Sequence, residues 1–254
     1  MKKILTALAL LLSGLALVLA LDPGHFAFQY IDAGGSGAAG APLEMWERVQ
    51  PEVSRFSAAV AYDRAGIGLS APGQEPRDAR QIARELHTAL QNAGVAPPYI
   101  LVGHSFGGPF IRVFADLYPR DVGGLVLVDP TQEEFIFGNQ ARDTNYVARQ
   151  DAEGKDIQAS LVEAQESRVP AGIPVVLITG MGPRVFPSFV TEKQKQEYRA
   201  SHQLWLKYHA EWLKKVPNGQ HIITENSGHD IPFQEPELII RVIRQMVEQA
   251  RSHR

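Results

Sequence analysis

Short apolar runs alternate with amphipathic segments along most of this chain. The runs are almost continuously apolar, and they lie at residues 27–32, 58–62, 99–102, 124–129, 174–180 and 220–225. Between them, segments such as 77–93 and 237–250 carry apolar residues at helical spacing. Strands that are apolar on both faces are typical of a parallel sheet covered on both sides. The pattern therefore predicts an α/β fold, with a mainly parallel sheet and helices on both faces.

Two long segments interrupt this alternation. Residues about 131–170 are polar and mostly helical in character, and we interpret them as a helical lid insertion. Residues 182–217 open with a proline-containing loop and continue as a helix that carries Trp205, Tyr208 and Trp212. Long excursions from a compact domain often form lids or binding loops.

The first residues have the pattern of an export signal. Two lysines follow Met1, an apolar run covers 4–12 and continues at 15–19, and Val18-Leu19-Ala20 fits a small-x-small cleavage site. We predict a signal peptide at 1–20, a single domain at 21–254, and a secreted or periplasmic location. The alternative is an uncleaved segment that tethers the protein to a membrane.

Composition narrows the function classes. The 254 residues carry a formal net charge of −3 without a basic block, which argues against a nucleic-acid partner. The absence of cysteine excludes disulfides, thiolate metal sites and a cysteine nucleophile.

A Gly-x-Ser-x-Gly pattern occurs at Gly103-His104-Ser105-Phe106-Gly107, between the apolar run 99–102 and a helical segment at 109–118. A strand, a sharp turn and a helix would hold the turn residue in a strained conformation with its side chain accessible. The flanking glycines remove Cβ atoms that would clash there. Ser105 is therefore a candidate nucleophile.

With three further segments, this pattern resembles the α/β-hydrolase family over residues about 28–250. The segments are Asp63–Ser70, Leu125–Pro130 and Ser227-Gly228-His229, each after a predicted strand. The resemblance implies acyl transfer to Ser105, with His229 as its base and without a metal or cofactor. A serine at this position argues against the dehalogenase and epoxide hydrolase members of the family, which use aspartate.

The acid of the triad is harder to assign. The commonest family position follows the run 174–180, but the loop there reads Met181-Gly182-Pro183-Arg184 and has no carboxylate. Asp129 ends the preceding strand, which is the family's alternative position. We predict Asp129 as the acid, with Glu133 or Glu134 as the alternative.

The family resemblance also implies two backbone donors for an oxyanion. We assign them to the N–H groups of Phe106 and, in a glycine-rich loop, Gly35. Few residues precede this loop, so the N-terminal sheet edge is expected to be short. Either 27–32 leads into the oxyanion loop and the family's first hairpin is missing, or 27–32 is an earlier strand.

These features predict a serine hydrolase that acts on small-molecule carboxylic esters with small or medium apolar groups. Amidase, lactonase, thioesterase or perhydrolase chemistry stays open, as does a non-catalytic binding protein on the same fold. The aromatic residues that could line an apolar pocket are Trp46, Phe106, Phe110, Phe135, Phe137, Phe186, Phe189 and Trp205.

Overall fold

The computed structural model describes residues 27–33, 45–66, 70–140 and 156–252. The signal peptide expected at 1–20 lies outside these ranges and stays a prediction. No helix within the described ranges combines the length and the apolarity that a membrane crossing requires.

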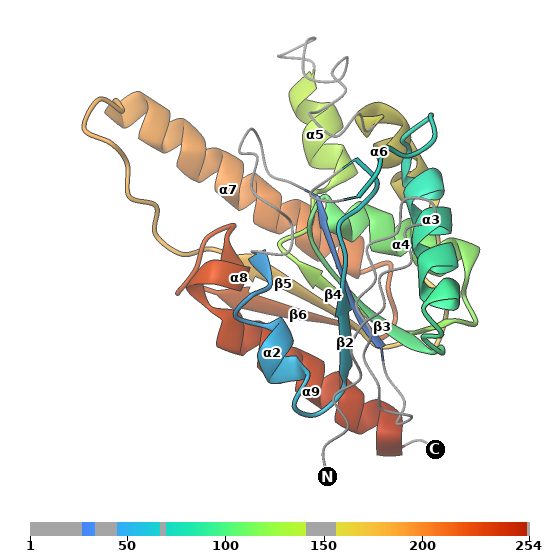
Figure 1. Ribbon diagram of the computed structural model, residues 1–254. Coiled ribbons are helices and arrows are strands. Elements are labelled where there is room, and N and C mark those ends of the chain that lie inside the picture. Colours follow the sequence, from blue (N-terminus) through green and yellow to red (C-terminus); the bar gives the residue numbers. More distant parts are fainter. Residues whose placement is uncertain (1–26, 34–44, 67–69, 141–155, 253–254) are drawn as a thin grey trace.

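A six-stranded sheet forms the centre of the described structure (Figure 1). Its order is β2-β1-β3-β4-β5-β6, and every neighbouring pair is parallel. The strands are β1 (Ala27–Ala33), β2 (Ala58–Ala61), β3 (Tyr99–Ser105), β4 (Val122–Val128), β5 (Val175–Gly180) and β6 (Gly219–Thr224). The parallel sheet expected from the apolar runs is confirmed.

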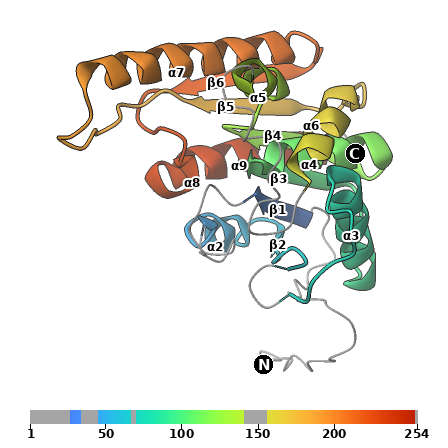
Figure 2. The same cartoon turned by 90° about the horizontal axis from the view of Figure 1, so that it is seen from above.

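Helices cover both faces of this sheet (Figure 2). One face carries α2 (Gln50–Val53), α8 (Ile231–Gln234) and α9 (Pro236–Ser252), and the other carries α3 (Ala79–Asn92), α4 (Gly107–Leu117) and α6 (Ile157–Glu166). Two further helices, α5 (Glu133–Gln140) and α7 (Glu192–Leu213), lie near the β4–β6 side of the molecule.

Alternation along the strands divides the apolar core into two clusters. In β3, Leu101 packs with Phe110 and Phe114 of α4, whereas its neighbour Val102 packs with Ile239 of α9. Successive side chains of a strand point to opposite faces, so one apolar run supplies both clusters. The same run ends at the candidate nucleophile, which the core therefore anchors on both sides.

The predicted lid contains two described helices. The second of them, α6, packs against α3 and α4, and its Leu161 and Ala164 are fully buried. The buried guanidinium of Arg112 donates to the carbonyl of Ala164 at 2.5 Å. This half of the segment belongs to the helical layer, and the role of residues about 131–170 as a lid stays a prediction.

The register of β1 supports one of the two alternatives for the N-terminal edge. This strand lies between β2 and β3, and Ala33 at its end is paired with Ser105. It therefore leads toward the glycine-rich loop beside the nucleophile strand. Within the described residues β2 is the edge of the sheet, in agreement with a short N-terminal edge.

The turn from β3 to α4 depends on close backbone approach at Gly103. A Cβ atom there would lie 2.5 Å from the carbonyl oxygen of Gly107 and 2.6 Å from its carbonyl carbon. These neighbours are backbone atoms of the turn itself, so they cannot move aside without displacing Ser105.

We therefore expect Gly103→Ala to lower the free energy of unfolding by about 2 kcal/mol or more, measured by urea denaturation. Gly138→Ala is the matched control, because the nearest atom to its Cβ would be the Tyr208 hydroxyl at 3.6 Å. Alanine has a higher helix propensity than glycine, so this control should be neutral or slightly stabilising. Equal stability of Gly103→Ala and the wild type would contradict the steric account.

Candidate active site

Ser105 is the last residue of β3, and Phe106 separates it from the first residue of α4. Its φ of 53° is a left-handed value that residues with a side chain rarely adopt. The N–H of Thr131 donates to the Ser105 carbonyl at 2.9 Å and ties this strained residue to the segment after β4. Backbone strain of this kind persists where the surrounding structure enforces it.

Three side chains from separate strand ends form one hydrogen-bonded chain. The Nε2 atom of His229 lies 3.1 Å from Ser105 Oγ, and its Nδ1 atom lies 2.6 Å from Asp129 Oδ2. A carboxylate only accepts hydrogen bonds, so Nδ1 carries the proton and Nε2 is left to accept the serine hydroxyl proton. The structure thus brings together the predicted nucleophile, base and acid.

The loop that carries His229 is fixed from several sides. Ser227 is buried and donates its hydroxyl to Glu235 at 3.1 Å, and its carbonyl accepts from the Gly182 N–H at 2.8 Å. The Nε2–H of His104 donates to the His229 carbonyl at 2.8 Å. His104, which the sequence placed inside the elbow, therefore also positions the backbone of the candidate base.

Asp129 is almost completely buried and also has a left-handed φ, of 42°. Its Oδ1 atom accepts from the Gly180 N–H and from the indole N–H of Trp205, both at 3.1 Å. Burial pushes the pKa of Asp129 upward, but His229, His209 and the Trp205 hydrogen bond together outweigh it, so the net pKa lies below its usual value. The carboxylate is therefore ionised at neutral pH.

The alternative acids are engaged elsewhere. Glu133 is 2.7 Å from the Arg112 guanidinium, and both side chains are almost fully buried. Glu134 faces Lys215 at 3.7 Å. Of the three carboxylates considered from the sequence, the one that contacts His229 is Asp129.

Two further histidines lie behind the acid and were not expected from the sequence. The Nε2–H of His209 donates to the Pro130 carbonyl at 2.8 Å, and its Nδ1 accepts the Thr179 hydroxyl at 2.7 Å. The Nε2–H of His221 in turn donates to Thr179 Oγ1 at 2.8 Å. Burial lowers the pKa of His209 to about 4, which keeps this ring neutral.

Of the two predicted oxyanion donors, the structure describes Phe106 and not Gly35. Phe106 directly follows Ser105 and caps the N-terminus of α4. Gly35 lies outside the described residues, and both assignments stay predictions.

The aromatic residues considered for a pocket fall into separate places. Phe135 and Trp205 meet edge to face at 4.9 Å between ring centroids, and Trp205 lies 6.4 Å from the His229 ring. Trp46 and Phe110 are instead buried in opposite core clusters, and Phe189 is 82% exposed. Of the aromatic residues considered, Trp205 therefore contacts the candidate base, and Phe135 packs against Trp205.

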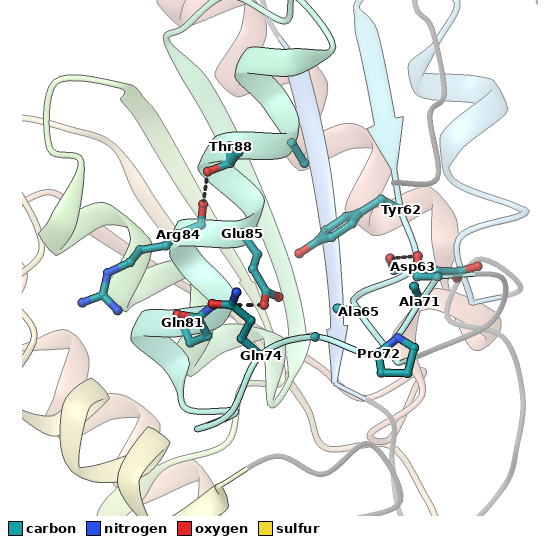
Figure 3. Close-up of a pocket in the computed structure, with 13 residues that line it drawn as sticks. Tyr62, Asp63, Ala65, Ala71, Pro72, Gln74, Gln81, Arg84, Glu85 and Thr88 are labelled. Atoms are coloured by element: carbon teal, nitrogen blue, oxygen red, sulfur yellow. Dashed lines mark hydrogen bonds between the residues drawn. The ribbon is translucent and has the colours of Figure 1, made fainter. Parts of the chain in front are cut away.

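A cavity of about 520 Å³ lies between α3 and the loop after β2 (Figure 3). Tyr62, Gln81 and Glu85 are among its lining residues, and none of Ser105, Asp129 or His229 is. It is thus separate from the hydrogen-bonded chain described above.

The depressed pKa of His209 leads to a prediction about stability. Between pH 6.5 and about 4 the unfolded chain binds a proton at this residue that the folded chain does not. The free energy of unfolding should therefore fall as the pH falls through this window, by up to roughly 3 kcal/mol from this group. Urea denaturation at several pH values measures the slope, and His209→Gln should flatten it. Identical slopes in both proteins would contradict the assignment.

Comparison with known proteins agrees with this fold. A family model described as the alpha/beta hydrolase fold matches residues 36–170, just over half of the chain. The uncharacterized protein YqjL of Bacillus subtilis (strain 168) is 29% identical over 205 residues, which cover 79% of this chain and 77% of that protein.

Solved structures share the fold at low sequence identity. A thermophilic esterase from Thermogutta terrifontis aligns with a TM-score of 0.59 at 17% identity, covering 94% of this chain and 92% of its own. The haloalkane dehalogenase DbeA from Bradyrhizobium elkani USDA94 aligns with a TM-score of 0.60 at 16% identity, covering 93% and 94%. These two likenesses concern the fold alone, because their names describe different reactions. The match of the family model over more than half of the sequence places this chain in the α/β-hydrolase family.

Proposed function

We propose that this protein is a serine hydrolase that cleaves carboxylic esters with small or medium apolar groups through an acyl-enzyme. The observation that carries the proposal is the continuous hydrogen-bonded chain from Ser105 Oγ through His229 to Asp129 Oδ2. A serine hydroxyl is a weak nucleophile at neutral pH, and an adjacent imidazole oriented by a carboxylate is the arrangement that activates it.

In the first half of the reaction, Ser105 Oγ forms a bond to the ester carbonyl carbon while its proton passes to His229 Nε2. The developing oxyanion is stabilised by the Phe106 N–H and, in this proposal, by that of Gly35. The carbon–oxygen bond to the alcohol then breaks, and His229 returns the proton to the leaving oxygen. Asp129 stays ionised throughout and stabilises the imidazolium.

The second half repeats these steps with water. His229 takes a proton from the water molecule, whose oxygen bonds to the acyl carbon. The Ser105–acyl bond then breaks, and the proton returns to Ser105 Oγ. The carboxylic acid leaves, and the free enzyme is restored.

The surroundings of His229 support an apolar substrate. The ring of Trp205 lies beside His229, and Phe135 packs against Trp205. Aromatic rings next to the reacting atoms favour an apolar group of the ester over a charged one. A panel of p-nitrophenyl esters of increasing acyl length, with matched amide, lactone and thioester substrates, compares the remaining acyl-transfer chemistries.

We expect Ser105→Ala to lower kcat for p-nitrophenyl butyrate by roughly 10⁴-fold or more, because the bond-forming oxygen is lost. A fluorophosphonate probe should label the wild type and leave this variant unlabelled. Circular dichroism and thermal unfolding should show that the variant is folded. A folded wild type that neither reacts with the probe nor turns over any ester would instead favour a non-catalytic binding protein.

Asp129→Asn should lower kcat by about 10³–10⁴-fold, because an amide cannot fix the imidazole tautomer or balance the imidazolium charge. Glu134→Gln is the matched control, since this carboxylate lies near Lys215, at 3.7 Å, and does not contact His229. Its kcat should stay close to that of the wild type. The acid assignment is wrong if the Asp129 variant stays active while the Glu134 variant is crippled.

A further inference from the structure

One face of α7 contacts the strand ends that carry the candidate acid. His202, Trp205 and His209 are spaced three and four residues apart, and this spacing places them on the same side of a helix. Each of the three side chains makes a hydrogen bond to the ends of β4 or β5, or to the residues just after them. In Figure 2, α7 runs alongside β5 and β6.

The three contacts converge on the Asp129-Pro130 turn. Trp205 donates its indole N–H directly to Asp129 Oδ1. His209 donates to the carbonyl of Pro130, and His202 donates at 2.8 Å to the carbonyl of Gly180, whose own N–H donates to Asp129 Oδ1. The helix thus contacts the carboxylate, the residue after it and Gly180, whose N–H donates to the carboxylate.

The turn has physical reasons to need this support. Asp129 has a φ of 42°, which is unfavourable for a residue with a side chain, and its carboxylate is almost completely buried. A buried charge is tolerated only when hydrogen bonds replace the lost water. The donors to Oδ1 within the described chain are the Gly180 N–H and Trp205.

We propose that α7 stabilises the position of the catalytic acid and that Trp205 is a positioning residue that fixes the orientation of the Asp129 carboxylate. His209 supports the same turn through the Pro130 carbonyl. This inference rests on the proposed function, since it assigns Trp205 a role in orienting the triad. Its ring also borders His229, so one side chain both orients the acid and forms a wall beside the base.

The role predicts a specific kinetic signature. Without the indole donor, the Gly180 N–H is the remaining donor named for Oδ1, so the carboxylate gains freedom to rotate about its Cβ–Cγ bond and Oδ2 holds the His229 Nδ1–H less firmly in one direction. Proton transfer from Ser105 then becomes slower, whereas the aromatic wall for substrate is retained if phenylalanine replaces tryptophan. The loss should therefore fall on kcat and leave KM nearly unchanged.

The test is a double-mutant cycle on ester hydrolysis. Trp205→Phe should lower kcat by about tenfold to a hundredfold, the effect of losing a hydrogen bond to a charged group. In an Asp129→Asn background the same substitution should change kcat by less than about threefold, because the carboxylate that it orients toward His229 is gone. Trp212→Phe is the matched control, since this tryptophan lies on the same helix but packs over Arg112 at 4.7 Å.

Equal effects of Trp205→Phe in both backgrounds, or a loss no larger than that of Trp212→Phe, would overturn the positioning role.

A second measurement does not depend on activity. The chain has three tryptophans, so its indole N–H signals can be assigned by NMR from the Phe variants. The Trp205 signal should move in Asp129→Asn, whereas those of Trp46 and Trp212 should stay.

The two measurements separate this inference from the proposed function. Absence of ester turnover and probe labelling in the wild type defeats the proposed function. If the Trp205 indole N–H signal does not respond to Asp129→Asn, the positioning role of Trp205 is wrong, whatever the activity.

Discussion

The hydrogen bond between His229 Nδ1 and Asp129 Oδ2 is the interaction on which the rest of the site depends. It joins residues 100 positions apart in the sequence across 2.6 Å. It fixes which nitrogen of the imidazole carries the proton, and it thereby leaves the other nitrogen to face Ser105. It also helps a carboxylate buried to this degree to keep its charge, because His229, together with His209 and Trp205, offsets the penalty of burial and lowers the pKa of Asp129.

The sheet makes this contact possible by aligning the carboxyl ends of its strands. Ser105 ends β3, Asp129 follows β4, and His229 lies in the loop after β6. Parallel strands bring these ends to one edge, where ligands and substrates of open α/β sheets are bound. Both Ser105 and Asp129 have left-handed backbone conformations there. Strain at two neighbouring strand ends, held by the two core clusters below them, marks this edge as the specialised part of the fold.

The support of the acid differs from that of the nucleophile. Ser105 is positioned by local sequence, through a turn whose glycines permit close backbone approach. Asp129 is positioned from a distance, by α7 and by the end of β5. The long segment before β6, residues 182–217, is therefore more than a surface loop. Its C-terminal part packs in the core, and Trp205 within its helix contacts the acid. Tolerance to substitution should accordingly be low on one face of α7 and high on the exposed face.

The sequence by itself determined the fold class, and it predicted the elbow at Ser105 from a local pattern and His229 as the base through the family resemblance. Continuous apolar runs indicate buried parallel strands, and glycines at fixed spacing indicate the elbow. The sequence favoured Asp129 as the acid and kept Glu133 and Glu134 as alternatives, since the three carboxylates lie within six residues and local patterns do not say which one turns toward the base. Only the tertiary structure showed which carboxylate contacts the imidazole, by pairing Glu133 with Arg112 and Asp129 with His229. It alone also connected Trp205 to Asp129, because that contact spans 76 residues and joins a helix to a strand end. A tryptophan within a helical pattern is equally compatible with ordinary core packing, so the sequence carries no signal for a hydrogen bond that exists only once the chain has folded.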